Sequence, residues 1–183
     1  MTTAGSVSGR ERLRLFCALR LPDEIGGAVV GWQRAHLRDG RIVPPEHLHL
    51  TLAFLGSRPL GDVASIAREL RAAAASAGRI CFEPVRYRET RSVGMLVLDD
   101  EDGASGALAR DLHERLRRLG VYEPEKRPWL PHITVLRFKR APRLAPPLPD
   151  LGRFSPSDAA LYHSVLRSTG AQYEALETAA LGG

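Results

Sequence analysis

Two copies of a His-x-Thr pattern carry the residues best suited to chemistry in this sequence. The first copy is His49-Leu50-Thr51-Leu52 and the second is His132-Ile133-Thr134-Val135. Aliphatic and β-branched residues surround both copies, which is typical of β-strands. Successive side chains of a strand point to opposite faces. Each copy therefore presents an imidazole beside a hydroxyl on one face and aliphatic side chains on the other.

Two imidazoles that face one cleft could catalyse displacement at phosphorus. Histidine titrates near neutral pH, so one neutral ring can accept a proton while a second, charged ring donates one. In-line displacement places the attacking and the leaving oxygen on opposite sides of the phosphorus. We therefore predict that His49 and His132 form an acid–base pair, and that the hydroxyls of Thr51 and Thr134 hold phosphate oxygens.

An internal duplication relates the two copies. His132 follows His49 by 83 residues, and the same offset places the strand-like run 13–16 on 96–99 and the helical segment 23–37 on 106–120. Three elements that share one offset indicate a repeat. The sequence thus predicts two lobes related by a pseudo-two-fold axis, with one His-x-Thr strand of each lobe lining the cleft between them.

The remaining elements predict an α+β fold with mainly antiparallel sheets and flanking helices. Apolar residues at helical spacing predict a helix from Val63, ending at Gly78, and strand-like composition marks further strands and a final hairpin. The predicted strands are 13–21, 47–56, 80–88, 95–99, 132–140, 158–166 and 172–176. We expect residues 1–12 to form a disordered tail and residues 13–183 to form a single two-lobed domain.

Composition narrows the class of partner and the compartment. The chain has 183 residues, a formal charge of +5 and a pI near 9.8, which favours anionic partners such as RNA and nucleotides. Cys17 and Cys81 lie in apolar runs without a CxxC spacing, so we expect buried thiols in a reducing cytoplasm. No apolar run approaches membrane-spanning length and no signal peptide is evident. We expect a monomer.

The wider context of the motifs resembles a known family. The segments that carry the resemblance are LHLTLAFLG at 48–56, RPWLPHIT at 127–134, LYHS at 161–164 and GAQYE at 170–174. They are similar to the 2H phosphoesterase superfamily, and within it to the bacterial RNA 2′,3′-cyclic phosphodiesterases, formerly described as 2′-5′ RNA ligases. The resemblance covers roughly residues 13–177. It implies a bilobal fold, no metal or other cofactor, and hydrolysis of 2′,3′-cyclic phosphates of RNA ends or nucleotides to 2′-phosphates. It further implies that His49 donates a proton and His132 accepts one.

Several residues near the motifs have two interpretations. Arg127 could brace the phosphate or only solvate its loop, and we include it as a candidate for substrate binding. Family members often carry an amide residue where this chain has His47, which we expect to be a solvated histidine at the beginning of the strand. Phe54 and Trp129 could stack on a base, but Phe54 has the same parity as Leu52 and is predicted to lie in the core. The other histidines, which we expect to be structural or superficial, are His36, His113 and His163.

Other functions remain as alternatives. A metal hydrolase could use His47, His49 and His132, although the motifs lack nearby carboxylates and threonine is a poor metal ligand. A non-catalytic RNA-binding module would keep the fold and the basic charge without needing both histidines. A phosphodiesterase for another small cyclic nucleotide or for 2′-5′-linked oligonucleotides would meet the same reacting group.

Overall fold

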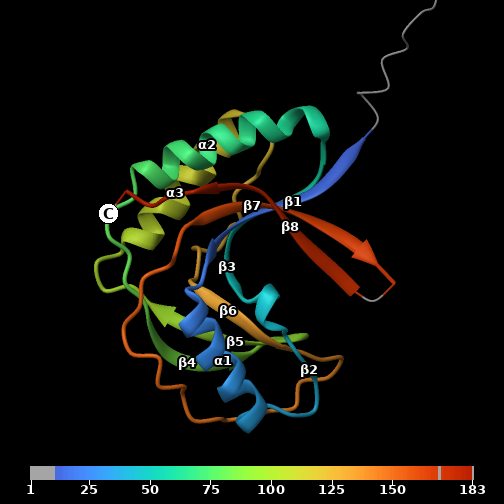
Figure 1. Ribbon diagram of the computed structural model, residues 1–183, viewed down its shortest axis with the longest axis vertical. Helices are drawn as coiled ribbons and strands as arrows, with labels where there is room; N and C mark the ends of the chain where they lie inside the picture. The colour runs from blue at the N-terminus through green and yellow to red at the C-terminus, as the bar shows by residue number, and fades with distance from the viewer. Residues whose placement is uncertain (1–10, 169, 183) are drawn as a thin grey trace, which may run out of the picture.

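Two four-stranded antiparallel sheets form the framework in the described part of the chain, residues 11–168 and 170–182 of the computed structural model (Figure 1). Sheet A has the strand order β3 (His49–Pro59), β1 (Arg12–Arg20), β7 (Ala159–Arg167), β8 (Gly170–Ala179). Sheet B has the order β2 (Arg41–Ile42), β6 (His132–Arg137), β5 (Val93–Asp99), β4 (Glu83–Glu89). All neighbouring pairs are antiparallel. The predicted α+β class with antiparallel sheets is therefore confirmed.

In the described part of the chain three α-helices cover these sheets: α1 (Asp23–His36), α2 (Val63–Ala75) and α3 (Ala104–Arg118). Pro22 precedes α1 and Asp23 and Glu24 occupy its first turn, where carboxylates interact favourably with the helix dipole. Each helix buries one apolar stripe; in α3 the stripe includes Leu108, Leu112 and Leu116. The elements β1, α1 and β3 repeat as β5, α3 and β6, in the order that the 83-residue offset predicts.

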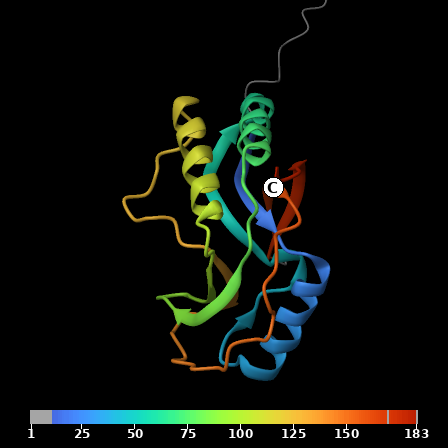
Figure 2. The ribbon, with the colours of Figure 1, turned by 90° about the vertical axis from the view of Figure 1, so that its left-hand side faces the viewer.

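Each of the two repeated helices packs on the sheet of the other half. Although α1 follows β1 of sheet A, its Gln33 is fully buried and donates through Nε2 to the carbonyl oxygens of Val43 and Val135, beside sheet B. In the reciprocal arrangement α3 packs with α2 on sheet A, where His113 Nε2 lies 2.7 Å from Leu52 O. Figures 1 and 2 show α2 and α3 together at one end of the molecule and α1 at the other. The first lobe thus comprises sheet A, α2 and α3, and the second comprises sheet B and α1.

Several predicted boundaries differ from the structure. β6 ends at Arg137 instead of Arg140, because a proline-containing irregular segment follows. The strand predicted at 80–88 begins at Glu83, while Phe82 forms an isolated bridge with Phe154. β2 was absent from the prediction because two residues give no periodic signal. Of the predicted tail, residues 1–10 lie outside the described residues, whereas Arg12 begins β1 and donates to Ser57. The expected hairpin turn includes Thr169, which is also outside them.

Buried apolar side chains of both lobes form one cluster, including Leu15 of β1, Leu96 of β5 and Ile133 of β6. Cys17 belongs to it, and burial raises the pKa of its thiol to about 12. Cys81 is only half-buried, so the expectation of a buried thiol holds for Cys17 alone; both thiols are free. No helix among the described residues is long and apolar enough to span a membrane.

Candidate active site

The two His-x-Thr strands meet at the junction of the lobes. Trp129, in the loop before β6, donates its indole N–H to the carbonyl oxygen of Thr51 on β3 at 2.9 Å. A cavity of about 990 Å³ opens between the sheets there. Its lining includes His49 and Thr51 from the first lobe and His132 and Thr134 from the second. The structure thus brings together the four residues that the duplicated pattern singled out.

Both histidines are held in the same way. The Nδ1 atom of His49 lies 2.8 Å from the carbonyl oxygen of His47, and Nδ1 of His132 lies 2.8 Å from that of Leu130. A carbonyl oxygen only accepts, so each Nδ1 carries a proton and donates it to the carbonyl two residues earlier. In a neutral ring the opposite atom, Nε2, then bears the lone pair and can accept a proton. Nε2 of His49 also lies 3.1 Å from the hydroxyl oxygen of Thr51.

The free protein keeps His49 neutral. Burial lowers the pKa of His49 to about 4, and the positive potential of His47, Arg137 and His132 adds to this effect, while the bond to the His47 carbonyl opposes it. Burial likewise lowers the pKa of His47. An imidazole with these surroundings becomes charged near neutral pH only if an anion approaches it.

Aromatic rings cause the burial of His49. The ring of Phe16 on β1 lies 5.1 Å from that of His49, and the ring of Tyr173 on β8 packs against His49 edge-on at 5.6 Å. Tyr173 also contacts the ring of His47 at 4.3 Å. His47 is therefore not the solvated strand residue that we expected. It belongs to a 3-10 turn, Pro45–His47, where its ring packs on Tyr173 and its carbonyl orients His49.

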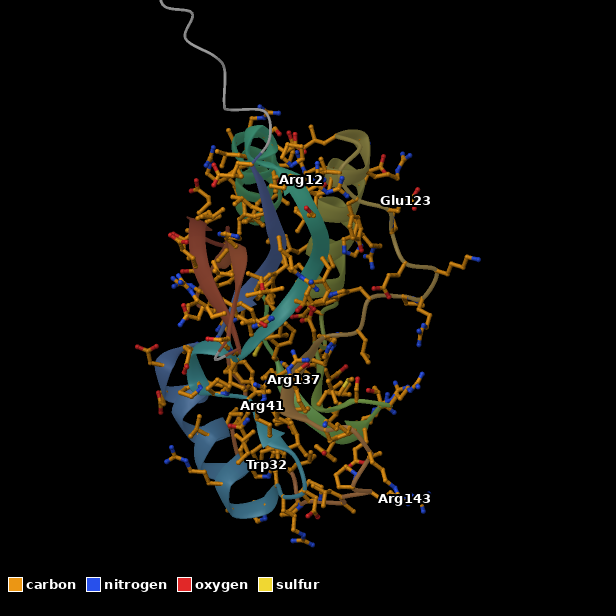
Figure 3. All side chains as sticks on the ribbon, turned by 90° about the vertical axis from the view of Figure 1, so that its right-hand side faces the viewer. Arg12, Trp32, Arg41, Glu123, Arg137 and Arg143 are labelled. Atoms are coloured by element: carbon orange, nitrogen blue, oxygen red, sulfur yellow. The ribbon has the colours of Figure 1, made fainter. Side chains whose placement is uncertain are left out.

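Among the described residues three arginines line the cavity: Arg14 of β1, Arg41 of β2 and Arg137 of β6. Within the described residues none of their side chains forms a hydrogen bond or ion pair, although other arginines of the chain pair with carboxylates. Arg41 and Arg137 are direct cross-strand partners, and Figure 3 labels them near one another. Like charges opposite each other are unfavourable without an anion. Glu46 is the one carboxylate among the described lining residues, so the cavity is electropositive.

Of the other residues proposed to contact the substrate, one lines the cavity and two do not. Arg127 is exposed and is not among the residues that line the cavity. Trp129 also lies outside that lining, and the N–H edge of its indole bonds to β3. The prediction that Phe54 lies in the core is wrong, because its side chain is 65% exposed and lines the cavity. A β-bulge in β3 reverses the alternation of side chains between Thr51 and Phe54.

Sequence reasoning missed Arg14, Arg41, Arg137 and Tyr173. Arg14 and Arg41 belong to no motif, and the pairing of β1 and β2 with distant strands brings them to the cavity. Tyr173 lies in the GAQYE segment, whose sequence indicates a family resemblance but no role for the tyrosine. As expected, His113 is structural, since it bonds to Leu52 O, while His36 lies exposed on α1. Among the described residues, no three His, Cys, Asp or Glu side chains are grouped so that they could hold a metal ion.

The fold and the paired histidines define a class of protein, a bilobal phosphoesterase with one His-x-Thr strand in each lobe. A model of the family described as the 2′-5′ RNA ligase superfamily matches residues 21–170, and the chain belongs to that family. It is 33% identical to a Thermus thermophilus protein named RNA 2′,3′-cyclic phosphodiesterase, over 93% of this chain and 91% of the relative. It is 30% identical to an Escherichia coli protein of the same name, over 93% of this chain and 98% of the relative. The crystal structure of E. coli LigT complexed with 3′-AMP superposes with a TM-score of 0.79 at 25% identity, over 94% of this chain and 100% of that chain.

Proposed function

We propose that this protein is a phosphoric diester hydrolase that converts the 2′,3′-cyclic phosphate of RNA ends or nucleotides to a 2′-phosphate. The observation that carries the proposal is the matched geometry of His49 and His132. Both donate Nδ1–H to a main-chain carbonyl, and both line one electropositive cavity from opposite lobes. The names of the two relatives described above agree with this chemistry.

The proposed reaction assigns one proton transfer to each histidine. Neutral His132 accepts a proton from water through Nε2, and the water oxygen attacks phosphorus opposite the 3′ oxygen. Protonated His49 donates the Nε2 proton to the departing 3′ oxygen, which leaves the phosphate on the 2′ oxygen. The bonds to the His47 and Leu130 carbonyls keep both rings oriented during these transfers.

Two threonine hydroxyls and one arginine hold the phosphate in the proposed complex. We assign the hydroxyls of Thr51 and Thr134, which line the same cavity as the two rings, as donors to non-bridging phosphate oxygens. Arg137, at the end of β6, supplies positive charge in the same cavity. Arg127 is exposed and does not line this cavity, whereas Arg137 does, so we assign Arg137 instead of Arg127 as the arginine that faces the phosphate.

The test is hydrolysis of an oligoribonucleotide that ends in a 2′,3′-cyclic phosphate, in excess EDTA, with the product isomer identified by ³¹P NMR. We expect a 2′-phosphate from the wild type and from His36→Ala, a matched control on the exposed side of α1. A 3′-phosphate product, or activity that appears only after a divalent metal is added, would contradict the proposed mechanism. A protein that binds the oligonucleotide without hydrolysing it would be the non-catalytic RNA-binding module instead.

We further propose that the protein acts as a monomer in the cytoplasm. Free Cys17 and Cys81 are the thiol states expected of a reducing compartment. Light scattering coupled to size-exclusion chromatography tests the oligomeric state, and a mass well above 20.0 kDa would contradict it.

A further inference from the structure

The two motif strands contain a bulge at the same position of the repeat. In β3, Leu52 has no partner in β1, although the residues on either side of it are paired. In β6, Val135 has no partner in β5, and its two neighbours are again paired. Each skipped residue comes three positions after the motif histidine and directly after the motif threonine. A bulge interrupts the ladder of hydrogen bonds, so this ladder holds each threonine from one side only.

A helix side chain donates to the carbonyl oxygen of each skipped residue. Nε2 of His113 on α3 lies 2.7 Å from Leu52 O, and Nε2 of Gln33 on α1 lies 2.7 Å from Val135 O. Since a carbonyl oxygen only accepts, both side-chain nitrogens donate. The Gln33 amide also donates to Val43 O at 3.1 Å, and the main-chain N–H of Val43 donates to Val135 O at 3.1 Å. Both interruptions of the ladder are thus bridged by a donor from outside the sheet.

Each donor belongs to the repeat opposite the strand that it contacts. The helix α1 precedes β3 in the chain but reaches β6, and α3 precedes β6 but reaches β3. The two donors are not at equivalent positions, because the 83-residue offset relates His113 to Val30, about one helical turn before Gln33. The same carbonyl therefore receives a donor from a different turn in each half, so the shared contact is not a simple consequence of the duplication.

The surroundings of Gln33 argue against a role in stability alone. Its side chain is fully buried, and Oε1 has no hydrogen-bond partner among the residues that the structure describes. A buried polar atom without a partner is unfavourable, so the amide contributes less to stability than its two hydrogen bonds suggest. Neither Gln33 nor His113 lines the cavity. An effect of either residue on the reaction must therefore pass through the motif strands.

The threonines connect the bulges to the proposed chemistry. Both line the cavity, and the hydroxyl oxygen of Thr51 lies 3.1 Å from Nε2 of His49. We infer that His113 and Gln33 are positioning residues, which hold Thr51 and Thr134 in place by fixing the bulge in each motif strand. The inference rests on the proposed function, in which these hydroxyls donate to phosphate oxygens, and adds the residues that keep the hydroxyls in position. His113 acts through Thr51, and Gln33 acts through Thr134.

The experiment is a crossed set of double-mutant cycles. Values of kcat/KM for adenosine 2′,3′-cyclic phosphate and dissociation constants for adenosine 2′-phosphate are measured for His113→Leu, Gln33→Met, Thr51→Val and Thr134→Val. The same quantities are measured for the double variants that combine one helix change with one threonine change. We expect His113→Leu to lower kcat/KM about tenfold in the wild type and with Thr134→Val, but less than about twofold with Thr51→Val. Gln33→Met should show the opposite pattern.

Controls on α3 separate the hydrogen bond from the stability of the helix. His113→Gln keeps a side-chain N–H that can donate to Leu52 O, and it should retain at least about half of the wild-type kcat/KM. Leu116→Val removes a buried methylene of α3 but no donor. It should lower the midpoint of thermal unfolding and leave kcat/KM unchanged. All assays are made well below the lowest midpoint, and His113→Asn or Gln33→Leu replaces a variant that does not fold.

Three results would overturn the inference. If His113→Leu and Gln33→Met lower the unfolding midpoint but not kcat/KM, the two bonds only stabilise the fold. If each loss is the same with either threonine variant, the helix residues do not act through the bulges. If Leu116→Val loses as much activity as His113→Leu, activity only follows stability.

Failure of the proposed function gives a different result. A wild type that binds adenosine 2′-phosphate but hydrolyses no cyclic phosphate would contradict the proposed reaction. The crossed pattern would then be read from the dissociation constants alone. Coupling between His113 and Thr51 and between Gln33 and Thr134 would support the positioning roles, and additive effects would overturn them.

Discussion

The charge of His49 should depend on whether the cavity holds a phosphate. In the free protein the pKa of His49 is lowered from 6.5 to about 4 by burial, so only about 0.1% of the rings carry a proton at pH 7. A general acid must be protonated when the leaving oxygen departs. The proposed role of His49 therefore requires the substrate itself to raise this pKa.

The size of the effect follows from Coulomb's law. One negative charge about 4 Å from the ring contributes about 4 kcal/mol at an effective dielectric constant of about 20. Because one pKa unit corresponds to about 1.4 kcal/mol, this attraction raises the pKa of His49 by about 3 units, to about 7. Roughly half of the rings would then be protonated at pH 7 in the complex. The calculation predicts proton uptake on binding, and an affinity for phosphate ligands that falls as the pH rises through about 7.

The measurement is an NMR titration of protein with ¹⁵N-labelled histidine, with and without saturating adenosine 2′-phosphate. The His49 signals are identified by their loss in His49→Gln. We expect their titration midpoint to rise by about 3 units in the complex. His113, which bonds to Leu52 O on the far side of β3, should not respond to the ligand and provides the internal control. A His49 ring that stays neutral at pH 7 in the saturated complex cannot be the acid, and the roles of His49 and His132 would have to be exchanged.

Three further predictions concern the same site. His49→Ala and His132→Ala should each slow hydrolysis at least about a hundredfold. A nitrophenyl ester, whose leaving group needs no proton, should restore the activity of His49→Ala but not that of His132→Ala. If it restores only the activity of His132→Ala, the two roles are reversed. Oligonucleotide binding should weaken more steeply with added salt than mononucleotide binding. Arg14→Gln should reduce the slope of log K against log salt by up to about 1, whereas Arg34→Gln, on α1, should leave that slope unchanged. Equal slopes for the two ligands would show that the cavity arginines contact only the terminal nucleotide. In the unfolded chain His49 binds a proton below about pH 6.5, whereas in the folded protein it does so only below about pH 4. The free energy of unfolding should therefore fall by about 2 kcal/mol between pH 7 and pH 5. Chemical denaturation should show a smaller loss in His49→Gln than in the wild type, and identical losses would contradict the lowered pKa.

The order of the elements and the central site could be predicted because they depend on local pattern. Apolar residues at helical spacing mark α2 and α3, and the Pro22–Asp23 step marks the beginning of α1. The His-x-Thr spacing places an imidazole and a hydroxyl on one face of any strand, whatever that strand pairs with. The 83-residue offset then shows that two such strands belong to equivalent halves, and hence that both histidines should face one cleft.

Contacts between segments that are distant in the sequence determine which face of β3 Phe54 occupies and on which sheet each helix packs, and the local sequence pattern could not predict either. Whether Phe54 faces the core or the cavity depends on the bulge at Leu52, and that bulge exists only in the register of β3 against β1. Counting alternate residues along the sequence assumes a strand without a bulge, so the count assigned Phe54 to the wrong face of the sheet. The same holds for the exchange of α1 and α3 between the lobes, because an amphipathic stripe shows that a helix is buried but not which sheet buries it.

The sequence by itself determined the proposed acid–base pair, His49 and His132, since the chemistry of two imidazoles and their position on strands are properties of short segments. The tertiary structure alone decided the electrostatic character of the cleft. Arg14, Arg41 and Arg137 come from three strands of two sheets, and the rings that bury His49 come from β1 and β8. The charge of a histidine depends on the solvent that its neighbours exclude and on the charges that they bring near. These neighbours are far away in sequence, so the charge of His49 is set only when sheet A has formed and the second lobe packs beside it.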